Sequence, residues 1–131
     1  MANVNLIAAV AAAASSFLIG GLWYSPILFA NAWMREAQIP ESRLREGLGK
    51  VFGWSFALSL VAAVNLAFFL GRGAGIAWGA SAGALAGLGW VVATMGVIFL
   101  FERRSMMLLL IVGGYVAVSY TVMGAIIGLW P

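Results

Sequence analysis

Four apolar runs, each about 20 residues or longer, follow one another along this chain and are separated by short polar connections. An α-helix rises about 1.5 Å per residue, so about 20 apolar residues cross a hydrocarbon core about 30 Å thick. We therefore predict four transmembrane helices, at about residues 4–24, 51–70, 75–101 and 106–130.

The composition agrees with a membrane environment. Of the 131 residues, 64% are hydrophobic and 8% are charged, whereas soluble domains have about 45–50% apolar and about 25% charged residues. A soluble fold of this size has too little interior to bury so much apolar surface. We expect one membrane domain that spans residues 1–131.

The connections between the later spans are short. Each has about four or five residues, which favours consecutive helices as antiparallel neighbours. The expected fold is therefore an all-α integral membrane protein, a four-helix antiparallel bundle. One further short amphipathic helix, at about residues 26–39, is expected in the membrane interface between the first two spans.

The stretch that joins the first span to this interfacial helix is rich in aromatic residues. Amphipathic rings prefer the headgroup level of a membrane. Ser25 has the character of a helix N-cap, and Pro26 suits the first helical position. We interpret six residues of this stretch as a membrane-anchor motif: Trp23, Tyr24, Ser25, Pro26, Phe29 and Trp33.

Basic residues are distributed unequally among the connections. Lys and Arg are concentrated on the cytoplasmic side of membrane proteins. The first and third connections are therefore predicted to be cytoplasmic and both termini outside, in the inner (plasma) membrane of the cell. The first connection holds Arg35, Arg43, Arg45 and Lys50, the third holds Arg103 and Arg104, and the second holds Arg72.

Glycines recur at every fourth position in the third span. Helices in lipid associate through close contact of small-residue faces. Four glycines in one helix would also be costly for a soluble protein, at about 1 kcal/mol each relative to alanine. We predict a packing ridge formed by Gly75, Gly79, Gly83 and Gly87. The ridge could face another span or a second copy in a homo-oligomer.

The chain offers little material for catalysis. It contains no Cys, His or Asp, which excludes thiol chemistry, the commonest metal ligand and the usual triads. We expect no enzyme activity, no metal and no cofactor. Nucleic acid is not an expected partner, because no basic stripe with interleaved aromatic residues is present. Membrane lipid is the expected partner.

The four carboxylates all lie in connections or at their edges. A proton- or cation-coupled transporter normally has an ionisable residue inside the membrane, so their positions argue against that class. Glu102 is expected to form an interfacial ion pair beside Arg103 and Arg104.

Three polar residues within the spans are candidate intramembrane contacts: Asn65, Tyr115 and Ser119. They could form hydrogen bonds between helices, which in membranes contribute well under 2 kcal/mol. The first hypothesis is a non-enzymatic protein that acts through helix, partner or lipid contacts. The alternative is a small transporter or channel subunit for an uncharged or apolar solute, with these residues along its path. That alternative requires a cavity between the spans.

The segment from Gly20 to Trp33 reads Gly-x-x-Trp-Tyr-Ser-Pro-x-Leu-Phe-x-x-x-Trp. It resembles the bacterial membrane family named domain of unknown function 1761. Phe101 to Ser105, Gly114-Tyr115 and Met123 to Trp130 are similar to that family's closing hairpin. The resemblance implies a small four-span inner-membrane protein and implies no activity.

Overall fold

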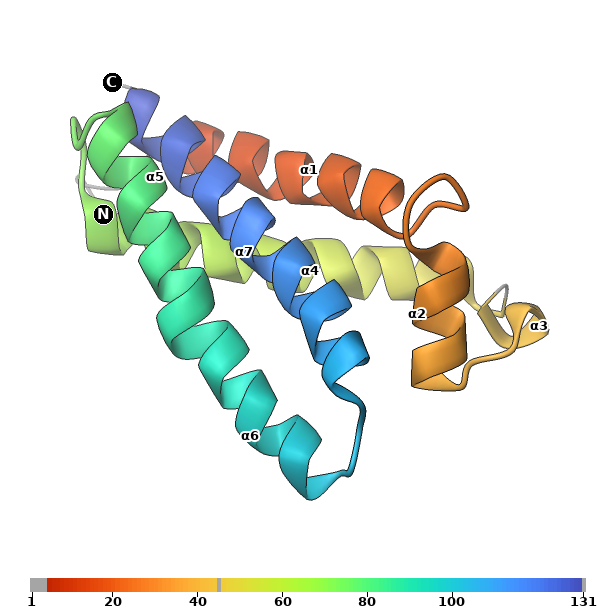
Figure 1. Cartoon of the computed structure of the whole chain (residues 1–131). Helices are drawn as coiled ribbons and strands as arrows, with labels where there is room; N and C mark the ends of the chain where they lie inside the picture. The colour runs from red at the N-terminus through yellow and green to blue at the C-terminus, as the bar shows by residue number, and fades with distance from the viewer. Residues whose placement is uncertain (1–4, 45, 131) are drawn as a thin grey trace.

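The computed structural model describes residues 5–44 and 46–130. Every regular element in this part of the chain is helical (Figure 1). Two expectations fall outside it: Val4 as the start of the first span, and Arg45 as a counted basic residue. The elements are α1 (Leu6–Trp23), α2 (Ala30–Ala37), α3 (Glu41–Leu44), α4 (Leu48–Leu70), α5 (Ile76–Ala86), the π-helical segment η1 (Gly87–Val92), α6 (Ala93–Phe101) and α7 (Met106–Leu129).

Four helices are long and apolar enough to cross a membrane. They are α1 with 18 residues, α4 with 23, the continuous run Ile76–Phe101 with 26, and α7 with 24. At about 1.5 Å per residue, their lengths are about 27 to 39 Å. The prediction of an all-α protein with four candidate membrane spans is confirmed.

Local hydrogen bonds determine where the helices begin. The Oδ1 atom of Asn5 accepts from the N–H of Ala8 at 3.1 Å at the start of α1. Ser105 acts in the same way for α7, where its Oγ accepts from the N–H of Leu108 at 3.1 Å. These side chains satisfy donors that the first turn of a helix leaves free.

The turn between α4 and α5 depends on glycine. Gly71, Gly73 and Gly75 have φ angles of 73°, 73° and 91°, a region that side chains with a Cβ rarely adopt. The N–H of Gly75 donates to the carbonyl of Gly128 at 2.9 Å. The turn is therefore bonded directly to the end of α7.

The long helices form two side-by-side pairs, α1 with α4 and α5 with α7, and α7 also packs on α1 (Figure 1). The buried face of α1 is made of alanines, among them Ala8 and Ala12, which are fully buried. They belong to one cluster with Ala63 and Ala67 of α4. Small side chains allow this close approach of helix backbones, which stabilises helix pairs in lipid.

The polar connections are separated along the molecule. The α4–α5 turn lies at the end where α1 begins and α7 finishes, and α2 lies at the other end of α1 (Figure 1). The α6 segment diverges from α7, and none of its residues is buried. Large apolar side chains such as Leu18 and Phe101 are 77% and 84% exposed. This exterior suits a hydrocarbon solvent.

Helix α2, the short helix expected in the membrane interface, starts later than expected. It begins at Ala30 rather than near residue 26, because Ser25 does not cap it. The Ser25 Oγ donates back to the carbonyl of Leu22 at 2.7 Å, and the Ser25 carbonyl accepts from the N–H of Ala30 at 3.1 Å. The segment from Ser25 to Phe29 is therefore a series of turns that ends α1.

The second span also begins earlier than expected. Helix α4 starts at Leu48 and includes Lys50, which the sequence places in the connection. A lysine can extend its charged end away from apolar surroundings while its stem stays with the helix. A charge near the end of a span therefore does not terminate the helix.

Candidate functional site

Trp23 connects the end of α1 to the first half of α7. Its indole Nε1–H donates to the backbone carbonyl of Ile111 at 2.8 Å. Its ring lies over Gly114, where a Cβ atom would come within 2.9 Å of the tryptophan Cζ2. Trp23 therefore needs both an available carbonyl and a residue without a side chain on α7.

Tyr24 lies beside two other aromatic rings. Its ring centroid is 4.7 Å from that of Trp33 on α2 and 5.5 Å from that of Tyr115 on α7. Trp23 contacts Phe29 with centroids 5.0 Å apart. We call these five residues, Trp23, Tyr24, Phe29, Trp33 and Tyr115, the aromatic junction. It joins α1, α2 and α7.

Tyr115 completes this junction by reaching back to α1. Its hydroxyl donates to the carbonyl of Ser16 at 3.2 Å. A Cβ on Gly20 would lie 3.3 Å from the Tyr115 ring, so small residues on α1 make room for the phenol. Burial, and secondarily the neighbouring Tyr115, raises the pKa of Tyr24.

The six residues expected as a membrane anchor are divided by the fold. Trp23, Tyr24, Phe29 and Trp33 are half-buried and pack on one another or on Tyr115, and their role as a membrane anchor stays a prediction. Ser25 is bonded to α1. The exposed apolar tip is formed by Pro26, Ile27 and Leu28. Of this tip, sequence reasoning named Pro26 and missed Ile27 and Leu28, because the aromatic residues were the more conspicuous signal.

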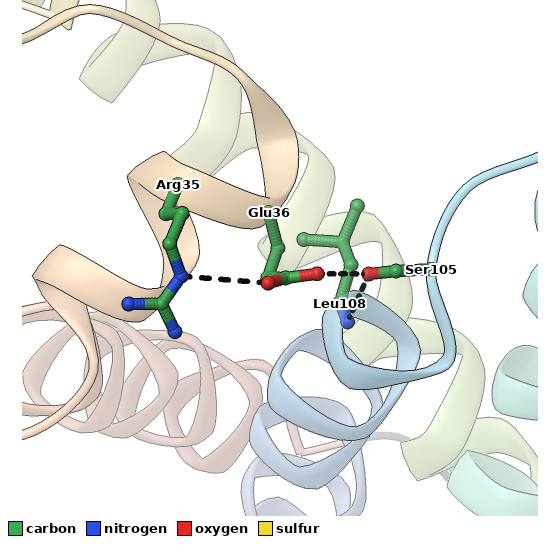
Figure 2. A network of polar contacts seen from close by, with 4 residues as sticks. All are labelled: Arg35, Glu36, Ser105 and Leu108. Carbon is green, nitrogen blue, oxygen red and sulfur yellow. Dashed lines mark hydrogen bonds and ion pairs between the residues drawn. The ribbon is translucent and has the colours of Figure 1, made fainter.

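A second contact holds α2 against α7 (Figure 2). Ser105 donates its hydroxyl to the Glu36 Oε1 at 2.5 Å, while the same oxygen accepts from the N–H of Leu108. Arg35 Nε lies 3.5 Å from the other carboxylate oxygen. A carboxylate is stabilised near a helix N-terminus by the helix dipole. Glu36 therefore fixes the end of α2 at the beginning of the last span.

A crevice of about 260 Å³ opens on the side of the molecule between α4, η1 and α7. Leu66 and Phe69 form one wall, with Trp90 of η1 opposite, and Asn65 and Tyr120 provide polar side chains. The rings of Phe69 and Trp90 meet edge to face with centroids 5.7 Å apart. This is a partly open space with aromatic and amide groups on its walls.

A sequence model of the family described as "Protein of unknown function (DUF1761)" matches residues 7–128. The chain belongs to the DUF1761 family. The resemblance seen in the sequence is thereby confirmed, and the matched range contains both the aromatic junction and the crevice. No curated protein and no solved structure matches the chain.

In this DUF1761 protein the third-span glycines face α7 of the same chain. A Cβ on Gly79 would collide with the Gly124 carbonyl oxygen, and one on Gly83 with the Tyr120 carbonyl oxygen. A Cβ on Gly87 would lie 3.0 Å from the Tyr120 Cβ. Gly75 belongs to the preceding turn rather than to α5. The row therefore contacts a span of the same chain.

The three polar candidates of this family member do not share one site. Asn65 is exposed and donates from Nδ2 to the Val61 carbonyl of its own helix at 2.8 Å. Tyr115 belongs to the aromatic junction. Ser119 is buried, and its hydroxyl has no hydrogen-bond partner among the described residues. The structure brings Asn65 together with Tyr120 instead.

Tyr120 is the crevice residue that sequence reasoning passed over. The sequence feature that could have identified Tyr120 is its spacing, because it lies four residues before Gly124 and eight before Gly128. That spacing places all three on the α7 face that meets α5.

Glu102 was expected to pair at the interface, and its Oε1 lies 2.8 Å from Arg104 Nε.

Proposed function

We propose that this multi-pass membrane protein acts without catalysis, through contacts that its helices make with lipid and with a second copy of the chain. One observation supports the proposal of a homo-oligomer. Gly49 and Gly53 on α4 have no atom within 4 Å of an added Cβ, in contrast to Gly79 and Gly83. Ala57 continues this exposed row at the same spacing.

Small residues four positions apart let two helix backbones approach closely in a membrane. The row on α4 is left open by the chain's own helices, so a second α4 helix could pack there. We place the protein in the inner membrane, with the first and third connections in the cytoplasm.

Oxidative crosslinking tests the homo-oligomer directly. The natural chain has no cysteine, so a single Gly53→Cys variant introduces the only thiol. We expect a covalent dimer in native membranes. Gly21→Cys is the matched control, because Gly21 is also exposed and has no atom within 4 Å of an added Cβ.

Equal crosslinking of both variants would indicate random collision and would refute an α4 interface. A strictly monomeric protein in mild detergent, measured by light scattering, would refute the oligomer. A Gly53→Leu variant should decrease the dimer fraction, since a bulky side chain separates the backbones.

A small transporter or channel subunit for an uncharged or apolar solute is the second candidate, and the crevice beside Asn65 favours it. Vesicles that contain the protein would then take up glycerol faster than empty vesicles, as measured by light scattering after mixing. Equal uptake rates in the two kinds of vesicle would contradict a transport function for glycerol and would favour the contact function.

A further inference from the structure

We propose that the crevice binds an uncharged molecule dissolved in the bilayer, with an apolar body and one hydroxyl or carbonyl group. This binding site goes beyond the contact function, because it does not involve a second copy of the chain. The inference rests on the polar groups of the crevice, its depth, its shape and its lack of charge.

The polar groups of the crevice are incompletely paired. Asn65 uses Nδ2 for a bond within its own helix, which leaves its carbonyl oxygen and one N–H. Within the described residues, neither this carbonyl oxygen nor the Tyr120 hydroxyl nor the Trp90 indole N–H has a protein hydrogen-bond partner. A ligand with a hydroxyl or carbonyl would supply the missing partner.

The depth of the crevice in the membrane increases the free energy that such a hydrogen bond contributes. Asn65 precedes the last residue of α4 by five positions, about 8 Å along the axis of a helix about 34 Å long. Water is scarce at such depth, and an unpaired polar group in hydrocarbon costs several kcal/mol. A bilayer-dissolved molecule is the available source of a hydrogen bond there.

The shape of the crevice follows from the π-helical segment. A π-helix widens the chain locally, and such segments occur frequently at functional sites. Here η1 places Trp90 against Phe69 of α4. The crevice has a volume of about 260 Å³. It therefore accommodates one ring or a short aliphatic segment.

The chemistry of the walls excludes a charged ligand. No charged side chain lines the crevice among the described residues, and an ion would have to enter hydrocarbon without a counter-charge, which is strongly unfavourable. Phospholipid headgroups stay at the surface for the same reason. The occupant is therefore neutral and apolar apart from its one polar group.

Photolabelling with a matched pair of probes tests this proposal. The first probe is a long-chain alcohol with a diazirine in its chain, and the second is the corresponding alkane without the hydroxyl. Each is added to vesicles that contain the full chain, and crosslinked residues are identified by mass spectrometry. We expect the alcohol to label residues 62–69 and 86–91 about fivefold more than the alkane, the factor that one net hydrogen bond provides.

Three variants make the result specific. Asn65→Leu should reduce alcohol labelling of the crevice to the level of the alkane. Thr94→Val removes a polar group from an exposed position on α6, outside the crevice, and should leave the labelling ratio unchanged. Ala86→Leu fills the crevice and should exclude both probes, which keeps the test decisive if Asn65→Leu fails to accumulate.

Equal labelling by alcohol and alkane would refute the proposed hydrogen bond. Labelling spread evenly over exposed faces such as that of Trp54 would refute the site itself. An unchanged ratio in Asn65→Leu would show that the amide is not the recognition group. These outcomes are independent of the crosslinking at Gly53.

Discussion

At the scale of single residues, Trp23 combines two roles that a substitution can separate. Its ring fills the space above Gly114, and its N–H binds the Ile111 carbonyl. We predict that Trp23→Phe lowers the stability by about 1 kcal/mol, through loss of one interhelical hydrogen bond. Trp23→Ala should lower it by about 3–5 kcal/mol, since it also leaves a cavity.

Thermal or denaturant unfolding in detergent micelles measures both changes. Trp54→Phe is the control, because Trp54 is 65% exposed and should change the stability little. If Trp23→Ala were as stable as the unchanged protein, Trp23 would have no packing role.

Tyr24 provides a prediction about pH. Its raised pKa means that the folded state favours the protonated phenol. The associated stability is full below about pH 10, the ordinary pKa of tyrosine, and is lost as pH rises through the higher folded-state pKa. We expect the melting temperature to fall above pH 10, and to fall less in Tyr24→Phe. Parallel curves for the two proteins between pH 9 and 12 would contradict this.

At the scale of helices, the contact between α5 and α7 is made by backbone against backbone. In an isolated helix, Gly83→Ala would be stabilising by about 1 kcal/mol. In this protein the new methyl group would meet the Tyr120 carbonyl oxygen, so we predict a loss of about 1–3 kcal/mol from overpacking.

Gly89→Ala serves as the control within the same span. An added Cβ at Gly89 has no atom within 4 Å, so this variant should be neutral or slightly stabilising. Unfolding in micelles compares the two. A gain in stability from Gly83→Ala would show that α5 and α7 are not in close contact.

At the scale of the whole molecule, the distribution of basic residues predicts the orientation. The connections that hold Arg35 and Arg104 should be cytoplasmic and both termini outside. An alkaline phosphatase reporter fused after Pro131 should therefore be active, because this enzyme works on the outer side. A fluorescent protein at the same position would be bright only if the C-terminus were cytoplasmic, which would overturn the orientation.

The sequence predicts the spans well because span length is a local property of apolar runs. It predicts α2 less well, since the Ser25-Pro26 pair fits either a helix start or a closing turn. The contacts of Trp23 and Tyr115 could not be predicted, because they join residues 88 and 99 positions apart. The π-helical segment has no periodic signal of its own, so the crevice was not visible in the sequence.

The hydrogen bond from Trp23 to Ile111 has a consequence for biosynthesis. Its acceptor is made 88 residues after its donor, and chains grow at about 5–20 residues per second. Trp23 is therefore made roughly 4 to 18 s before its acceptor on α7. During that interval Trp23 must be held by lipid or by the insertion machinery, and the last helix completes the fold.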